Sequence, residues 1–286
     1  MVGDLDDGTR AVLIPVLSCV TRGIDPVCPA CAAGRTNHCG RLAFGHLEPG
    51  LQSGFCESTG GGWSAEMVAH PSQLLAVPDH LSDEAAVMVE PTACAVHAAR
   101  RVAAHGPLDT VAVIGTGTLG LLTIAALRHA SSGATIGRIL ATGKYPHQKD
   151  LARSLGADQV VAPGELGRVV RSLTGAWVLG DGPEGPATGG EGQLTDGVDL
   201  VVDCVGSPAS LTQALHVVAP GGEVLVVGMP GHTSLDLTTL WHRETAIRGC
   251  YAYTRPDFEA AVSVVADADL GRLVSATYPL SRYTEA

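Results

Sequence analysis

The sequence predicts an α/β protein in which a doubly wound parallel sheet follows a smaller, mainly β region. Between residues 110 and 253, short apolar segments typical of strands alternate with longer segments of helical character. Residues 1–80 instead carry short apolar segments separated by glycine, proline and cysteine. With 286 residues, 45% of them hydrophobic and 16% charged, the chain is long and apolar enough for two domains with their own cores.

The first region is expected to contain a β-hairpin and then to become helical. The segment "VGDLDDGTRAVLIPV" places an Asp-Gly pair between apolar residues, which favours a tight turn between two strands. A helical pattern begins near residue 83. Pro91 suits the first turn of that helix, because the missing N–H of proline costs little there.

The second region is expected to form a parallel sheet covered on both faces by helices. The predicted strands are 110–115, 137–142, 158–162, 199–206, 222–229 and 246–253. The predicted helices between them are 119–130, 146–157 and 210–219. The glycine-rich stretch 180–197 lacks periodicity and is predicted to be a loop insertion, because strand and helix units continue after it.

The stretch "VAVIGTGTLGLL" predicts a dinucleotide-binding loop of the Rossmann type. It follows a predicted strand, opens a predicted helix and carries the pattern G-x-G-x-x-G. In such a loop the first glycine makes a tight turn, the second admits a pyrophosphate and the third lets helix and strand pack closely. The alternative is a glycine-rich turn without a ligand. The predicted cofactor contacts are Gly115, Thr116, Gly117, Thr118, Leu119 and Gly120.

The end of the next strand favours NADP over NAD. NAD-binding loops place an Asp or Glu there to hold the ribose 2′-hydroxyl, but in this chain the position falls on Gly143. Lys144 and Tyr145 follow at once, so a 2′-phosphate would meet a cation and no carboxylate. NAD remains the alternative, in which Lys144 is only a solvated loop residue.

The stretch "DPVCPACAAGRTNHC" predicts a structural zinc site. Cys28 and Cys31 form a C-x2-C pair, and Cys39 supplies a third thiolate. The fourth ligand is either Cys19 or Asp25, and Cys19 is favoured because structural zinc prefers sulfur. An unmetallated or redox-active pair is the alternative. A complete four-ligand shell has no open position for substrate, so this site is expected to be a clamp.

These features together resemble the medium-chain, zinc-dependent alcohol and polyol dehydrogenases. The resemblance covers essentially the whole chain. It rests on the cysteine cluster, the glycine loop and the segments "GGGWSAEMVAHPSQLLAVPDHLSDEAAVMVEP", "EPTACAVHA", "LGADQVV", "GVDLVVDCVGS", "APGGEVLVVGMPG" and "VSATYPLSRYTEA". It implies a partial, mainly β catalytic domain with a zinc lobe at residues 1–98. It also implies a Rossmann domain at 99–272 and the start of a return to the catalytic domain at 273–286.

The resemblance also implies a hydride transfer between NADP and the hydroxyl of an alcohol, polyol or sugar, assisted by a catalytic zinc. Of the family's catalytic ligands only the glutamate of the "EP" segment maps here, onto Glu90, which is therefore a predicted catalytic and metal-binding residue. The alternative for Glu90 is a carboxylate favoured by a helix N-terminus. His46 and Glu48 in "FGHLEPG" follow the zinc lobe, whereas the family motif precedes it.

Two other hypotheses about function therefore compete with that of an active dehydrogenase. Both ends of the chain are shorter than the family pattern, so a truncated remnant that binds zinc and NADP(H) without catalysis is one of them. A zinc-independent reductase of the same superfamily is the other, and the lobe cysteines and Glu90 argue against it.

Charge and cysteine usage narrow the partners and the compartment. A formal net charge of -11 disfavours nucleic acid and anionic membranes. The run 108–127, in which Asp109 is the one charged residue, changes from a strand pattern to a helix pattern across its glycines, so no membrane span is expected. Eight cysteines without a signal peptide indicate the reducing cytoplasm. A small-molecule substrate and a homo-oligomer, dimer or tetramer, are implied by the family.

Overall fold

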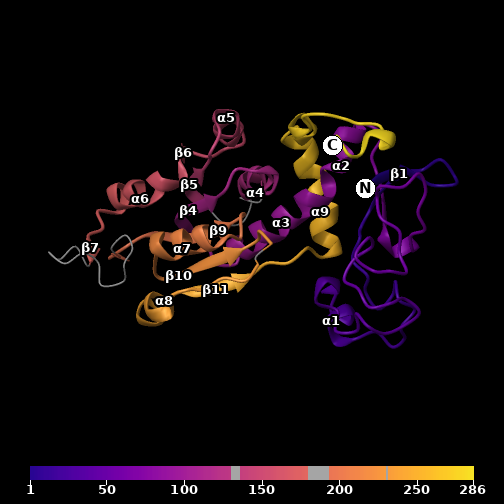
Figure 1. The fold of residues 1–286 in the computed structure, drawn as a ribbon, viewed down its shortest axis with the longest axis horizontal. Helices are drawn as coiled ribbons and strands as arrows, with labels where there is room; N and C mark the ends of the chain where they lie inside the picture. The colour runs from indigo at the N-terminus through magenta and orange to yellow at the C-terminus, as the bar shows by residue number, and fades with distance from the viewer. Residues whose placement is uncertain (130–135, 180–192, 230) are drawn as a thin grey trace. The chain divides into compact units, whose positions relative to one another are not determined.

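A computed structural model describes residues 1–129, 136–179, 193–229 and 231–286. The chain divides into two compact units, one formed by residues 1–97 and 252–286 and the other by residues 98–251 (Figure 1). The helix α3 (Val89–Ala103) contains the first boundary. Residues 252–272, which the sequence assigned to the Rossmann domain, lie in the first unit, because their helix packs on α2 (Asp83–Val87).

The first unit contains a small antiparallel sheet and a cysteine-rich lobe, which is the segment around Cys19, Cys28, Cys31 and Cys39. Its strands are β1 (Val2–Asp4), β2 (Arg10–Leu13) and β3 (Leu74–Ala76), in the order β1-β2-β3. The amide of Leu5 donates to the carbonyl of Thr9 across the Asp-Gly turn, which confirms the predicted hairpin. The lobe carries α1 (Pro29–Ala32), and the helix that returns to this unit is α9 (Arg255–Asp267).

The lobe is held by one buried arginine. The Arg22 side chain is fully buried, and its guanidinium donates to the backbone carbonyls of Phe44, Leu47, Glu48 and Gly50. Those carbonyls belong to a loop without a strand or helix partner, so the guanidinium supplies hydrogen bonds that a regular element would otherwise provide.

The second unit is built on a six-stranded parallel sheet. Its strands are β4 (Leu108–Ile114), β5 (Ile136–Thr142), β6 (Gln159–Val161), β9 (Val198–Asp203), β10 (Val218–Val226) and β11 (Ala246–Gly249). They follow the spatial order β11-β10-β9-β4-β5-β6, and every pairing is parallel. The order turns back at β4, which is the doubly wound arrangement that the sequence predicted.

The helices of this unit are α4 (Thr118–His129), α5 (Pro146–Ser154), α6 (Leu166–Thr174), α7 (Pro208–Val217) and α8 (Leu237–Arg243). The helix pairs α4 with α5 and α6 with α7 pack together. A two-stranded ribbon joins β7 (Val178–Leu179) to β8 (Gln193–Leu194). The predicted loop insertion begins at residue 180, and its residues 180–192 lie outside the described residues.

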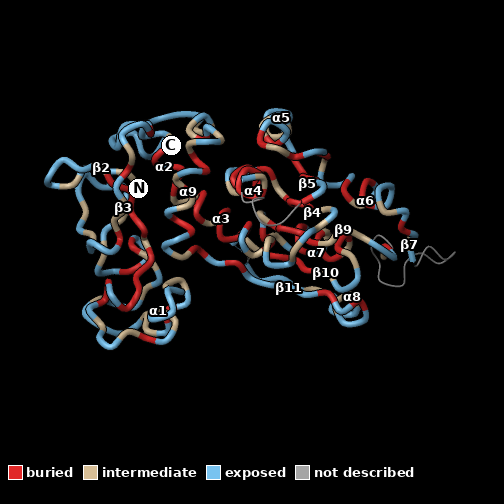
Figure 2. Tube along the Cα trace, turned by 180° about the vertical axis from the view of Figure 1, so that it is seen from behind, coloured by how far each residue is buried: buried red, intermediate tan, exposed pale blue. Residues whose placement is uncertain are grey.

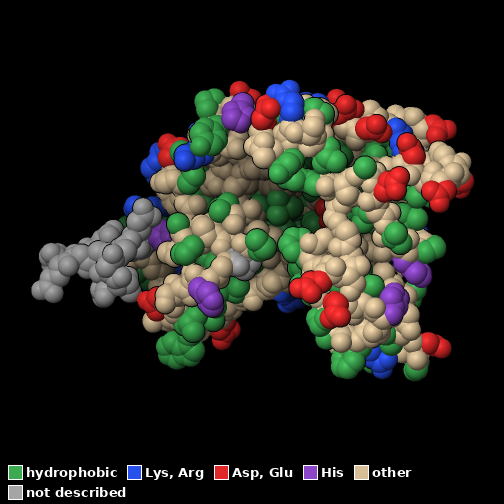
Figure 3. Space-filling model, turned by 45° about the vertical axis from the view of Figure 1, so that its right-hand side comes forward, with side chains coloured by type: hydrophobic (Ala, Val, Ile, Leu, Met, Phe, Trp, Pro, Cys, Tyr) green, Lys and Arg blue, Asp and Glu red, His purple; other side chains and the backbone are tan. Residues whose placement is uncertain are grey.

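One buried cluster of the second unit lies between the central strands and the helices α6 and α7, and α4 is also largely buried, as the buried segments in Figure 2 show. The middle of β9 (residues 200–202) and the second half of β4 (residues 111–114) are apolar and buried, because both faces of a central parallel strand are covered. On the face drawn in Figure 3, Lys and Arg side chains are scattered among acidic ones rather than gathered in a basic patch. Within the described part of the chain, no helix is both long and apolar enough to cross a bilayer.

Candidate cofactor and metal sites

The glycine loop joins the end of β4 to the start of α4, and each glycine occupies a different environment. Gly115 has φ +91°, a left-handed conformation that a side chain would strain. A Cβ on Gly120 would lie 1.7 Å from the carbonyl oxygen of Gly115, so only glycine permits this packing. A Cβ on Gly117 would meet no atom within 4 Å. The open side of the loop is therefore at Gly117, where a ligand phosphate would approach.

A hollow of about 350 Å³ adjoins the loop and is lined by residues from the carboxyl ends of the central strands. The hydroxyl of Thr142 accepts a 2.9 Å hydrogen bond from the amide of Gly115 and so holds the loop against β5. Thr116 lines the hollow, is 2% exposed, and its Oγ1 has no hydrogen-bond partner. A buried hydroxyl without a partner is costly, so this residue is suited to bind a polar ligand.

The predicted specificity residues follow β5 at one end of this hollow. A Cβ on Gly143 would lie 2.7 Å from Thr116 Oγ1 and 2.9 Å from Lys149 Cγ, so an acidic side chain does not fit without a local shift. Lys144 lines the hollow, and its ammonium lies 5.4 Å from the centre of the Tyr145 ring. Tyr145 is half exposed and does not line the hollow itself.

The remaining predicted loop residues, Thr118 and Leu119, form the first turn of α4 and do not line the hollow. Their position at the helix N-terminus directs backbone amides toward the loop, because the first amides of a helix have no partner within it. Their side chains are exposed and partly buried, respectively.

A second loop lines the hollow, and the sequence pattern did not reveal it. Ser207 and Ser210 lie at the start of α7 and both line the hollow. The loop is held by Asp203, a fully buried carboxylate that accepts hydrogen bonds from the amide of Val205 at 2.9 Å and from the hydroxyl of Ser210 at 2.9 Å. An Asp at the end of an apolar strand was the available signal, but only the sheet order places it beside the glycine loop.

The four lobe cysteines converge in the first unit. The sulfur atoms of Cys19, Cys28, Cys31 and Cys39 all lie within 4.8 Å of one another, and this is the single such group of potential metal ligands among the described residues. Asp25 is not part of it. Four sulfur donors at this spacing match the tetrahedral shell of a structural zinc ion. The structure thus brings together the set that the sequence favoured.

The backbone around these thiols supports metal binding. Hydrogen bonds from the amides of Cys31 and Gly40 lower the pKa of the Cys28 thiol to about 6. Burial raises the pKa of Cys31 and of Cys39. One thiol is therefore prepared to ionise while two others stay protonated without a cation, and a bound zinc ion would favour their thiolate forms.

Glu90 lies in the first turn of α3 and is partly buried. Its Oε1 accepts a 2.7 Å hydrogen bond from the hydroxyl of Tyr253, which is 1% exposed. In the ranges that the structure describes, no two further His, Cys, Asp or Glu side chains join Glu90 in a metal-ligating group. A catalytic zinc requires about three protein ligands, so the residues present here do not fit that ion.

The sequence profile of zinc-binding dehydrogenases matches residues 118–267. The chain is 30% identical to the L-idonate 5-dehydrogenase of Vitis vinifera over 258 residues, which are 88% of this chain and 60% of that protein. It is also 30% identical to the sorbitol dehydrogenase of Arabidopsis thaliana, covering 86% of this chain and 59% of that protein. The chain thus spans about 60% of the length of these curated relatives.

The fold is also similar to solved structures. A protein of Sinorhizobium meliloti 1021, assigned as a zinc-binding dehydrogenase and solved with bound NADP, superposes with a TM-score of 0.66 at 27% identity. The match covers 93% of this chain and 68% of that one. The parallel sheet, the glycine loop and the cysteine lobe described above are therefore found together with the sequence profile of one family.

Proposed function

Because this chain belongs to the family of zinc-binding dehydrogenases, we propose that it is an NADP(H)-binding oxidoreductase chain. Its reaction would transfer a hydride between the nicotinamide and the hydroxyl of a small alcohol, polyol or sugar. The relatives that act on L-idonate and sorbitol support the polyol class. The bound cofactor would supply the hydride chemistry, and the protein would supply binding and orientation.

One observation carries the choice of NADP. The described residues that line the hollow beside the glycine loop include Lys144 and no carboxylate. An ammonium attracts a ribose 2′-phosphate, whereas a carboxylate would repel it and would bind the free hydroxyl of NAD instead. The crowding at Gly143 disfavours the acidic side chain that an NAD site would need. NAD remains the alternative cofactor.

Each part of the glycine loop has a distinct role in this proposal. Gly117 gives the pyrophosphate access to the backbone amides at the start of α4. Thr116 donates its unpartnered hydroxyl to the same ligand. The loop is already held by Thr142 and by the packing of Gly120 on Gly115, so little ordering is needed when the cofactor binds.

The test compares NADPH and NADH binding by Lys144→Ala, followed by the fluorescence of the reduced nicotinamide. A charge-assisted hydrogen bond is worth about 1.5–3 kcal/mol, so we expect NADPH to bind about 10- to 150-fold more weakly and NADH to be unchanged. Arg153→Ala is the matched control, because Arg153 is an exposed cation of α5 that pairs with Asp150 outside the hollow. An equal loss for both cofactors, or no loss, would contradict the assignment of NADP.

We also propose that Cys19, Cys28, Cys31 and Cys39 hold one structural zinc ion. Zinc would connect the two ends of the loop between residues 19 and 39 and so stabilise a lobe with little regular structure. Elemental mass spectrometry of the purified chain should find about one zinc per chain. A value near two would mean that Glu90 belongs to a second zinc site, and a value near zero would reject the lobe site.

A second candidate function is cofactor and zinc binding without catalysis. The hydrogen bond from Tyr253 to Glu90 favours it, because the carboxylate already has a protein partner and is not part of a metal-ligating group among the described residues. Assays of carbonyl reduction with NADPH and a panel of ketoses distinguish the two functions. Turnover that Glu90→Gln abolishes would support the dehydrogenase, and tight NADPH binding without turnover would support the second candidate.

Compartment and assembly are included in the proposal. A zinc site made of four thiolates needs reduced cysteines, which favours a reducing compartment such as the cytoplasm. All four residues of the edge strand β11 are exposed. An unpaired edge of this kind can pair with a second copy of the chain, so we include a homo-oligomer, dimer or tetramer, in the proposal.

A further inference from the structure

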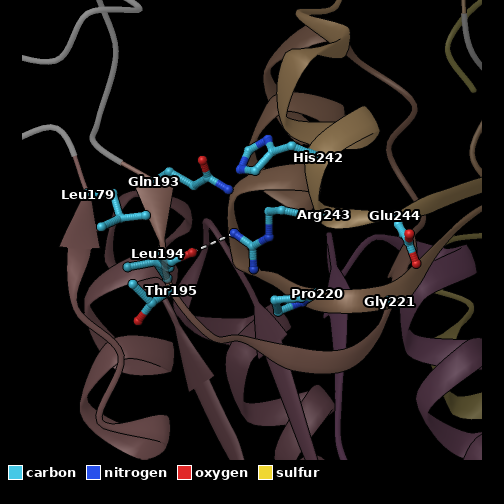
Figure 4. Close-up of a pocket in the computed structure, with 9 residues that line it drawn as sticks. All are labelled: Leu179, Gln193, Leu194, Thr195, Pro220, Gly221, His242, Arg243 and Glu244. Carbon is cyan, nitrogen blue, oxygen red and sulfur yellow. Dashed lines mark hydrogen bonds between the residues drawn. The ribbon is translucent and has the colours of Figure 1, made fainter.

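A second hollow lies in the unit of residues 98–251, away from the glycine loop. It has a volume of about 550 Å³ and is formed where β8, the start of β10 and the end of α8 meet (Figure 4). Its described lining contains Arg243 together with polar and apolar side chains. The hollow therefore combines polar and charged side chains with an apolar wall, which is the combination that fixes and covers a small organic ligand.

The distinctive residue of this hollow is Arg243. Its side chain is 5% exposed, and its guanidinium donates to the carbonyls of Leu194 at 2.5 Å and of Val218 at 2.8 Å. Its Nε has no hydrogen-bond partner. The two carbonyl contacts use only part of the donor set of a guanidinium, so N–H groups remain for another acceptor.

The charge of Arg243 also has no counter-ion within the described part of the chain. Among the described residues, no carboxylate lies within ion-pair distance of its guanidinium; Asp196 attracts it only from farther away. Burial lowers the pKa of Arg243, because removal from water disfavours the charged form. Glu244 also lines the hollow, but its side chain points away from the guanidinium (Figure 4).

The side chains around the guanidinium can complete an anion site. Gln193 and His242 are directed toward the same space as Arg243 (Figure 4). Thr195 also lines the hollow, but its hydroxyl points away from the guanidinium (Figure 4) and accepts a hydrogen bond from the amide of Trp177. Leu179, Leu194 and Pro220 form the apolar wall.

We propose that this hollow binds a small organic carboxylate, with the carboxylate on Arg243 and the apolar body against Leu179, Leu194 and Pro220. A guanidinium and a carboxylate form strong charge-assisted hydrogen bonds, and the ligand would supply a counter-ion that the described residues do not provide. Burying a charge without a partner is unfavourable, which gives the site an energetic reason to accept an anion.

This site is separate from the cofactor hollow. The strands of the sheet are parallel, and Val218 at the start of β10 is paired with Val198 at the start of β9. The second hollow therefore lies at the amino ends of these strands, whereas the glycine loop follows the carboxyl end of β4. The proposal does not depend on NADP being the cofactor, and its ligand should bind with the cofactor site filled.

The test uses hexanoate as the probe and the neutral hexanamide as its control, in the presence of saturating NADPH. Binding is measured by calorimetry and located by ¹³C-methyl NMR of leucine. We expect hexanoate to shift the methyl signals of Leu179 and Leu194 and to leave those of Leu119, in the first turn of α4, unchanged. Hexanamide should bind at least about tenfold more weakly, because a hydrogen bond to a neutral group is weaker.

Variants at two positions then test whether the positive charge of Arg243 binds the carboxylate of hexanoate. Arg243→Gln should weaken hexanoate binding at least about tenfold. Since this buried residue also supports two carbonyls, Leu179→Glu and Leu179→Gln provide an independent comparison at a half-exposed position. The glutamate should weaken binding far more than the glutamine, because it adds a competing carboxylate. Leu173→Glu, on α6 and outside the hollow, is the matched control and should have no effect.

Methyl shifts at Leu179 and Leu194 that weaken in Leu179→Glu and persist in Leu173→Glu would support the site. Absent hexanoate binding, equal binding of hexanamide, or equal affinity in Leu179→Glu and Leu179→Gln would overturn it. NADPH binding is measured on the same samples. Loss of NADPH binding would count against the cofactor assignment, whereas loss of hexanoate binding with NADPH still bound would count against this proposal.

Discussion

The pair formed by His97 and Asp257 makes a quantitative prediction about acid stability. Asp257 is 1% exposed, and its Oδ2 lies 2.8 Å from His97 Nδ1. The same oxygen accepts hydrogen bonds from the backbone amide of Thr254 at 2.8 Å and from its hydroxyl at 2.6 Å. Burial alone would raise the pKa of this carboxyl, but the hydrogen bonds from His97 and Thr254 outweigh it and lower the pKa to about 2.

The difference between this pKa and the ordinary aspartate value of 3.8 sets the magnitude. At 1.36 kcal/mol per pKa unit it corresponds to about 2.4 kcal/mol of unfolding free energy. The folded pKa is depressed, so the contribution is fully present above about pH 4 and is lost as pH falls through about 2. By pH 3 about half of it should remain.

The perturbation is Asp257→Asn, which keeps the side-chain size and removes the charge. We expect it to lower the unfolding free energy by about 2 kcal/mol at pH 7, and by about half as much at pH 3. Urea denaturation is followed by circular dichroism and by the fluorescence of Trp63, which lies in the same unit, in a background where Trp177 and Trp241 of the other unit are replaced by Phe.

A neutral variant on the same helix provides the control. Glu259→Gln removes an exposed carboxylate that pairs with Arg255. Surface pairs of this kind contribute about 0–1 kcal/mol, so this variant should change little at either pH. A loss below about 0.5 kcal/mol for Asp257→Asn at pH 7, or a loss that is equal at pH 7 and pH 3, would refute the reasoning.

Three further predictions concern the two sites and the lobe. Gly120→Ala should abolish measurable NADPH binding while circular dichroism stays unchanged, because its Cβ would lie 1.7 Å from the carbonyl oxygen of Gly115; retained affinity would contradict this. Cys31→Ser should reduce zinc in elemental analysis well below one per chain, whereas Asp25→Asn should leave it unchanged, and the reverse pattern would make Asp25 the ligand. Arg22→Met should cost about 3 kcal/mol or more in urea denaturation, since it removes the hydrogen bonds of a fully buried guanidinium to part-buried carbonyls of one loop, and a cost below about 0.5 kcal/mol would show that water replaces the guanidinium.

Local patterns in the sequence are enough to predict a large part of this protein. The glycine loop and the C-x2-C pair act through residues that are near in sequence, so their spacing alone predicts which backbone turns and which thiols meet. The strand and helix periodicity likewise predicted the parallel sheet, because the central strands of such a sheet are covered on both faces and so form short apolar runs. The structure confirms the sheet, the turn at the glycines and the convergence of the four thiols.

Other contacts depended on the tertiary structure. His97 meets Asp257 across 160 positions, and Tyr253 meets Glu90 across 163. Arg243 reaches the carbonyl of Leu194 across 49. No local pattern specifies such pairs, because they depend on the strand order and on which unit the chain re-enters at residue 252. A buried polar group is stable only when a hydrogen-bond partner lies beside it. Which residue lies there depends on how the whole chain packs, and not on the residues near in sequence.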